Sequence, residues 1–160
     1  MMKKISIVFL QTVIVLIGIV ALVILIWTPL TEGRATNLDV FSIYSDPFIL
    51  YVYVASIAFF IILYKAFKLL SYIGQHKVFS SSAIKILKRI KYCAIVLSIL
   101  IVMAGAYIKL FHHLDDDPAG FLAICALGVF VSIVIAATAN VFEMIVQHVI
   151  AMKAENEPAN

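Results

Sequence analysis

Of the 160 residues in the chain, 64% are apolar and 13% are charged, and the formal net charge is +3. A soluble domain has roughly 45 to 50% apolar and about 25% charged residues, so this chain has too few polar residues to cover a water-soluble globule. The net charge alone would suggest an acidic partner, but the basic residues gather in one stretch and membrane topology explains them, so we expect no direct nucleic-acid binding.

Long apolar segments separated by short polar segments predict an all-α integral membrane four-helix bundle. Residues 1–160 are expected to form a single transmembrane domain. About 20 apolar residues cross a bilayer as a helix. The first segment follows two lysines but lacks a small-residue cleavage site, which indicates a retained span rather than a signal peptide. The predicted spans are residues 5–27, 48–70, 92–108 and 119–142, with helical extension of the last to about residue 152.

The distribution of basic residues predicts the orientation. Residues 65–91 contain seven of the twelve basic residues and no acidic one, which is typical of a cytoplasmic segment. With this segment inside, ten basic residues fall on the cytoplasmic side, and Arg34 and Lys109 fall outside. We therefore expect a multi-pass protein of the bacterial inner, or cytoplasmic, membrane with both termini inside.

Local signals mark the expected helix ends. Pro29 should end the first helix, because proline has no amide hydrogen to donate. Asp46 before Pro47 is a helix start, since the carboxylate accepts free amide hydrogens and proline fits the first turn. Gly74 is a plausible helix end, and Ser80 caps the start of the next helix. Residues 28–46 form the outer loop, which lies against the headgroups or, alternatively, covers a site as a lid.

The helix that follows Ser80 is amphipathic and basic and leads into the third span. Its apolar side carries Ala83, Ile86, Leu87 and Ile90. Its basic residues are candidates for contact with anionic lipid headgroups, which would contribute about 1 kcal/mol each near the surface, or with a partner protein. These candidates are Lys85, Lys88, Arg89 and Lys91.

The densest polar cluster on the outer side follows the third span. Imidazoles and carboxylates there are weak candidates for binding a divalent metal. The alternative, which we favour, is a solvated turn whose Asp117 caps the fourth span before Pro118, and we predict no metal and no cofactor. The weak metal candidates are His112, His113, Asp115 and Asp116.

The fourth span carries small residues at every fourth position, a pattern that lets a neighbouring helix approach closely. This small-residue stripe consists of Gly128, Ser132, Ala136 and Asn140. Glu143 and Gln147 lie on the same side of the helix, so the face that packs also becomes polar.

Glu143 interrupts an uncharged run that reaches from residue 119 to residue 152. Because an ionised group inside a bilayer is costly, we expect a partner for it. The topology puts four basic residues at the same depth, namely Lys65, Lys88, Arg89 and Lys91. Two interpretations remain open: a clamp between the fourth helix and the central basic segment, or a protonatable carboxylate in a transport path.

Two regions of the chain resemble a known family. Residues 74–80, Gly-Gln-His-Lys-Val-Phe-Ser, lead into a helix with Ile84, Leu87, a basic pair and Ile90, and the fourth helix carries Gln147 and closes on Met-Lys-Ala-Glu-Asn-Glu at 152–157. This pattern resembles the small four-span bacterial membrane proteins classed as domain of unknown function 2975. Where members usually continue into Leu-Thr-Ile, this chain has Pro158, Ala159 and Asn160.

The resemblance implies a regulatory or accessory role in the membrane, because members are often encoded beside a small helix-turn-helix repressor. It supplies no catalytic residues. The chain itself has no His-Glu-x-x-His, Gly-x-Ser-x-Gly or phosphate-binding glycine loop, so we do not expect an enzyme.

The favoured hypothesis is an accessory, regulatory or protective membrane protein that packs against another membrane protein or itself through the small-residue stripe and the basic helix. Protection against a membrane-active toxin and sequestration of a repressor are both open. The alternative is a small oligomeric transporter or channel that uses the polar face formed by Asn140, Glu143 and Gln147.

Overall fold

The structure is a computed structural model that describes residues 2–31, 46–111 and 119–156. These residues form long helices: α1 (Met2–Thr31), α3 (Pro47–Gly74), α4 (Ser81–Phe111) and α5 (Ala119–Asn156). All four are long and apolar enough to cross a membrane. The predicted all-α, four-span membrane bundle is thereby confirmed. The outer loop from residue 32 to residue 45 lies outside the described residues.

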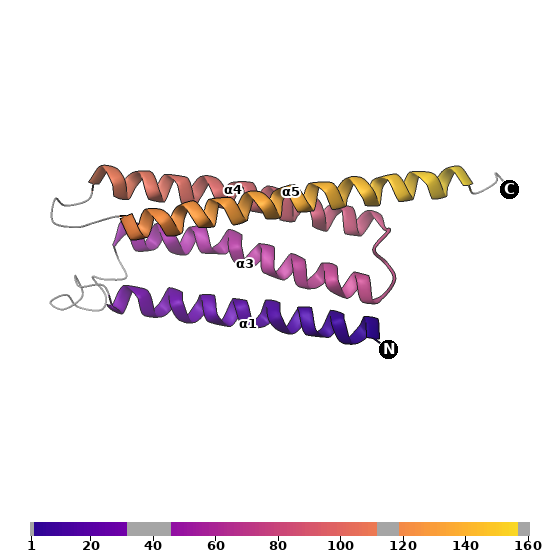
Figure 1. Ribbon diagram of the computed structural model, residues 1–160, viewed down its shortest axis with the longest axis horizontal. Coiled ribbons are helices and arrows are strands. Elements are labelled where there is room, and N and C mark those ends of the chain that lie inside the picture. The colour runs from indigo at the N-terminus through magenta and orange to yellow at the C-terminus, as the bar shows by residue number, and fades with distance from the viewer. Residues whose placement is uncertain (1, 32–45, 112–118, 157–160) are drawn as a thin grey trace.

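The helices run roughly along one common axis, and neighbours in the chain are neighbours in space (Figure 1). α5 crosses α4 and packs against it most extensively, α3 packs against α4, and α1 packs against α3. Both termini lie at the same end of the bundle as the turn that joins α3 to α4 (Figure 1). Each predicted span lies within one helix, and α5 extends beyond the other helices at that end.

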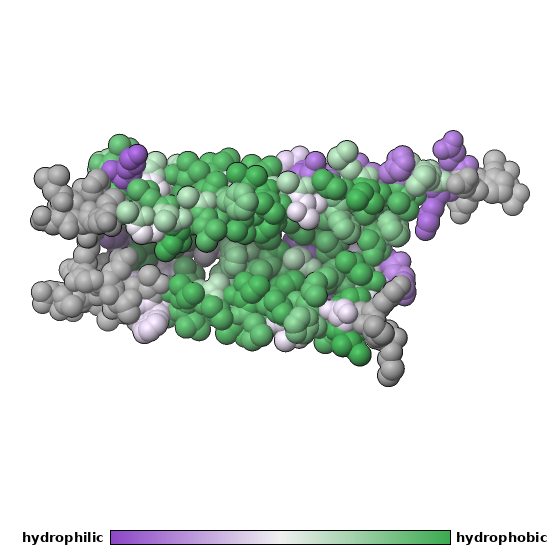
Figure 2. Space-filling model, viewed as in Figure 1, coloured by the Kyte–Doolittle hydropathy of each residue, from purple (hydrophilic) through white to green (hydrophobic). Residues whose placement is uncertain are grey.

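The best-buried part of the molecule lies between α3, α4 and α5. It contains Ile62 of α3, Ala139 and Val146 of α5, and one side of α4. The apolar side of α4 that the sequence predicted is buried there, since Ala83, Ile86, Leu87 and Ile90 are at most 6% exposed. Elsewhere the bundle surface is apolar, and polar side chains gather mainly toward the end where the C-terminus lies (Figure 2). This distribution suits a surface covered by lipid.

Pro29 does not end α1, contrary to the expectation from the sequence. It lies inside the helix, which continues to Thr31. A proline at position 29 cannot donate to the carbonyl of Leu25, four residues earlier. The hydroxyl of Tyr53 on α3 donates to that carbonyl oxygen at 3.2 Å instead. The helix continues because a neighbouring helix satisfies the freed acceptor, which the local sequence does not reveal.

The start of α3 forms as predicted. Asp46 Oδ1 accepts a hydrogen bond from the amide of Phe48 at 2.8 Å, and Pro47 occupies the first turn. The start of α4 also follows the prediction, because the Ser80 hydroxyl accepts from the amide of Ala83 at 3.3 Å.

α3 ends at Gly74 as predicted, but a different residue makes the turn. His76 takes the left-handed conformation, with φ of 57°, and it is the only non-glycine residue with positive φ in the described part of the chain. The amide of Lys77 donates to Tyr72 O at 2.9 Å, and the amide of His76 donates to Ile73 O at 3.2 Å. These two bonds are those of a Schellman motif, in which glycine usually takes the place of His76.

Candidate functional site

The small-residue stripe of α5 faces α4 within the same chain. A Cβ atom added to Gly128 would lie 3.3 Å from Cδ1 of Ile101 on α4. Ser132 is 4% exposed, and its hydroxyl donates to the Gly128 carbonyl oxygen at 2.8 Å. On the other side of the contact, Gly105 of α4 lies against Cys125 of α5, where an added Cβ would have its nearest neighbour at 3.6 Å. The glycines therefore let the two helices approach closely.

This placement bears on one part of the expected function. We expected the stripe to be a contact surface for a second protein, but α4 already covers Gly128 and Ser132. Small side chains in a span let a neighbouring helix approach closely, and here that helix is the preceding one in the chain. Asn140, at the end of the stripe, is exposed.

Next to the stripe, polar side chains of α4 and α5 meet around one carboxylate. Glu143 is 5% exposed. Its Oε2 lies 2.8 Å from Nζ of Lys91, and its Oε1 lies 3.8 Å from Nζ of Lys88. Gln147 Nε2 donates to Oε1 at 3.2 Å, and Lys91 Nζ also donates to Asn140 Oδ1 at 3.2 Å. We call these five residues the Glu143 cluster.

The Glu143 cluster explains how an acidic residue is accommodated within an apolar span. Asn140, Glu143 and Gln147 follow each other at helical spacing on one face of α5, and the two lysines lie one turn apart on α4. Burying a carboxylate is favourable only when charge and hydrogen bonds compensate it, and here an ammonium group and an amide do so. Two of the four predicted partners, Lys88 and Lys91, make the contact.

The other predicted partners lie elsewhere. The ammonium of Lys65 lies over the ring of Tyr64 at 5.2 Å from its centroid. Arg89 and Lys85 are exposed on α4, on the side away from its buried apolar residues.

The weak metal candidates His112, His113, Asp115 and Asp116 lie outside the described residues. Within the described residues, no group of three or more His, Cys, Asp or Glu side chains could hold a metal ion.

Sequence reasoning missed the polar contacts that hold α1 to α3. Gln11 Nε2 donates to the hydroxyl of Ser71 at 2.8 Å. The available signal was Gln11 itself, because an amide within an apolar span needs a partner.

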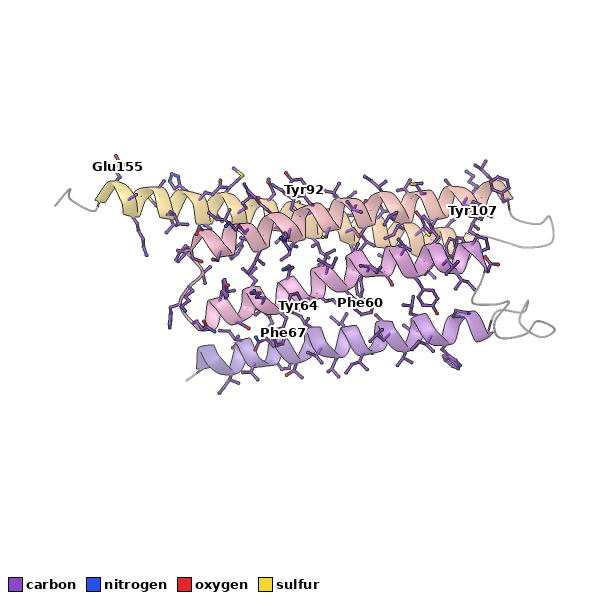
Figure 3. The ribbon with its side chains drawn as sticks, turned by 180° about the vertical axis from the view of Figure 1, so that it is seen from behind. Phe60, Tyr64, Phe67, Tyr92, Tyr107 and Glu155 are labelled. Atoms are coloured by element: carbon purple, nitrogen blue, oxygen red, sulfur yellow. The ribbon has the colours of Figure 1, made fainter. Side chains whose placement is uncertain are left out.

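Toward the end of the bundle opposite the termini, an apolar cavity of about 410 Å³ separates α1 from α3 and the start of α5. Phe60 of α3 lines it and lies between α3 and α1 in Figure 3.

Aromatic side chains hold α3, α4 and α5 together at the end opposite the termini. Tyr107 of α4 stacks on Phe48 of α3, with ring centroids 5.8 Å apart, and Phe121 of α5 meets Phe48 edge to face at 6.0 Å. Tyr107 is labelled at this end of the bundle in Figure 3. The Glu143 cluster thus joins α4 to α5, and the aromatic contacts near the other end of these helices join both of them to α3.

Comparison with known proteins agrees with this architecture. The family described as "Protein of unknown function (DUF2975)" matches residues 10–158. The "Uncharacterized membrane protein YoaS" of Bacillus subtilis (strain 168) is 37% identical over 158 residues, which make up 98% of this chain and 98% of that protein. No solved structure matches the chain. Since the family match spans nearly the whole chain, this membrane protein belongs to the DUF2975 family of proteins of unknown function.

Proposed function

We propose that the protein is an accessory or regulatory subunit of the bacterial cytoplasmic membrane, a protective role included, which packs against another membrane protein or against itself. It is not an enzyme in this proposal. The observation that carries the proposal is that Glu143, the buried acidic side chain of the described residues, is bonded to Lys91 and Gln147 of its own chain. In this proposal, the polar groups of Glu143, Lys91 and Gln147 serve to join α4 to α5.

The depth of the polar groups also favours an interaction protein over a single-chain transporter. Solute paths select their solutes with polar or charged groups that line the pore. Among the described residues, the buried polar side chains are Ser132 and Glu143. Beyond Ser132, apolar groups fill the contact between α4 and α5, where Gly105 meets Leu122 and Cys125. The polar groups are thus confined to one part of this interface.

Because α4 covers Gly128 and Ser132 of the stripe, the proposed partner surface is the basic side of α4 and the end of α5 that extends beyond the bundle. Lys85 and Arg89 are exposed, as are Lys153 and Glu155 of α5. They belong to the start of α4 and the last turns of α5, which lie at the end of the bundle where both termini lie (Figure 1). A partner that binds there would carry acidic side chains.

The test is purification of the tagged protein from its native host in mild detergent, with the particle mass and the co-purifying chains determined together. We expect a second protein in stoichiometric amount, and we expect neutralisation of Lys85, Lys88 and Arg89 to release it. The control variant Lys77→Gln changes an exposed lysine in the turn before α4 and should leave the complex intact. If the triple variant captured the partner unchanged, the basic face would not be the partner surface.

The second candidate function is a small oligomeric channel or transporter, and the exposure of Asn140 beside Lys91 favours it. Several copies could place these amides around a shared path. A homo-oligomer without companions, together with an ion flux in vesicles that Glu143→Gln abolishes while assembly is retained, would replace the accessory proposal with this one.

A further inference from the structure

A groove runs between α4 and α5 beside the Glu143 cluster. Its volume is about 320 Å³. Lys91 lies at one end, and apolar or small side chains form the rest, among them Ile95 and Ser98 of α4 and Ile133 and Ala137 of α5. The groove exists because small residues lie where the two helices cross, so neither helix fills the space between them.

Charge is distributed unevenly along this groove. Lys91, Ile95 and Ser98 line the groove from α4. Lys88 is not a lining residue, but it precedes Lys91 by one turn on the same side of the helix. The Lys88 side chain is 51% exposed, whereas that of Lys91 is 20% exposed and bonded to Glu143. Two ammonium groups face one carboxylate, which leaves a net positive charge at this end. The other end has no charged lining residue among those that the structure describes.

We propose that this groove binds one anionic phospholipid, with the phosphate at Lys88 and one acyl chain along Ile95, Ser98, Ile133 and Ala137. Lys88 lies at the end of the bundle where basic residues gather, at the depth of lipid headgroups in the predicted topology. A basic group there attracts an anionic headgroup, and an acyl chain attached to that headgroup meets the apolar groove directly. Neither a free phosphate nor a neutral hydrocarbon matches both ends of the groove.

Two variants separate the two halves of the proposed site. Lys88→Gln removes the charge, and Ala137→Phe fills the groove from α5 at a position that is not itself part of the Glu143 cluster. The matched control is Val134→Phe, at an exposed position of α5 that does not line the groove. Ser98→Leu fills the groove from α4 and serves if Ala137→Phe does not fold. Thermal unfolding in detergent shows which variants are folded.

The experiment measures retained lipid by native mass spectrometry, with phosphatidylglycerol and phosphatidylcholine of identical acyl chains as probes. The wild-type protein should retain one phosphatidylglycerol in preference to phosphatidylcholine. Lys88→Gln should weaken phosphatidylglycerol binding about fivefold, which corresponds to about 1 kcal/mol for one basic residue near the surface. Ala137→Phe should abolish retention of either lipid, and Val134→Phe should change nothing.

Each other outcome overturns the proposal. If Lys88→Gln weakens binding but the folded groove-filling variants do not, the lipid is held by its headgroup alone. If groove filling changes the mass of an oligomer rather than the bound lipid, a second copy of the chain occupies the groove. Because the assay uses purified protein and defined lipids, its result does not depend on whether a partner protein exists.

Discussion

At the scale of single residues, the contact between Glu143 and Lys91 decides how α5 is held. A carboxylate and an ammonium at 2.8 Å join α4 to α5 through two residues that are 52 positions apart in sequence. Removing one partner leaves a buried charge without compensation. Replacing both with apolar groups removes the two buried charges together with the bond between them. We therefore expect the pair to contribute more to the choice of helix register than to total stability.

We expect Glu143→Met to lower the free energy of unfolding by about 1–2 kcal/mol, because side-chain hydrogen bonds between membrane helices contribute up to about 1.7 kcal/mol. The double variant Glu143→Met/Lys91→Met should recover most of that loss. Unfolding by sodium dodecyl sulfate, followed by circular dichroism, measures both. A double variant as unstable as the sum of the two single variants would show that the two side chains act independently.

The second residue-scale prediction concerns Pro29 and Tyr53. The Tyr53 hydroxyl satisfies the carbonyl of Leu25 that Pro29 leaves without a helical donor. We expect Tyr53→Phe to cost about 1 kcal/mol, the usual net contribution of a hydrogen bond. In a Pro29→Ala background the amide of residue 29 donates to Leu25, so the same change should cost almost nothing. An equal cost in both backgrounds, measured by the same unfolding assay, would contradict this explanation.

At the scale of elements, the turn between α3 and α4 has a histidine where glycine fits better. The left-handed conformation costs an ordinary residue about 1–2 kcal/mol, and glycine loses about 0.5–1 kcal/mol through its greater freedom when unfolded. We therefore expect His76→Gly to raise the free energy of unfolding by about 0.5–1 kcal/mol. Gln75→Gly is the control. Because Gln75 has a φ of −94°, glycine at this position should lower the free energy of unfolding. Destabilisation by His76→Gly would mean that the imidazole makes a contact of its own.

Comparison of elements shows which features the sequence could predict. Helix positions follow from apolar runs, and the starts of α3 and α4 follow from Asp46 and Ser80, because a cap depends on residues within one turn. The continuation of α1 through Pro29 depends on α3, so no local signal carries it. Gln11 signals that its amide needs a partner, but only the packing of α1 on α3 makes Ser71 that partner. For Glu143, depth and charge narrowed the partners to four basic residues, but only the crossing of α5 over α4 selects Lys91.

At the scale of the whole molecule, attachment becomes weaker along the chain from α5 to α1. α4 is packed on both sides, by α3 and α5, whereas α1 packs against α3 at the edge of the bundle. None of the residues in the main buried cluster comes from α1. Between the Gln11 and Tyr53 contacts, α1 has mostly exposed apolar side chains, which lipid can cover. The α3, α4 and α5 helices therefore form the stable unit, and α1 is the helix that can separate from it most easily.

The last prediction tests the orientation of the whole bundle. Both termini and the turn between α3 and α4 lie at one end (Figure 1), and ten of the twelve basic residues predict that this end is cytoplasmic. In a variant whose two free cysteines are replaced by alanine, single cysteines at Lys77, Lys153 or Phe111 report the side of the membrane. A maleimide that cannot cross the membrane should label Phe111→Cys in intact cells and the other two only after permeabilisation. Labelling of Lys77→Cys and Lys153→Cys in intact cells would reverse the orientation. Labelling of just one of them would mean that α4 or α5 does not cross the membrane, and the helix that does not cross is the one whose two ends, Lys77 and Phe111 or Phe111 and Lys153, are labelled alike.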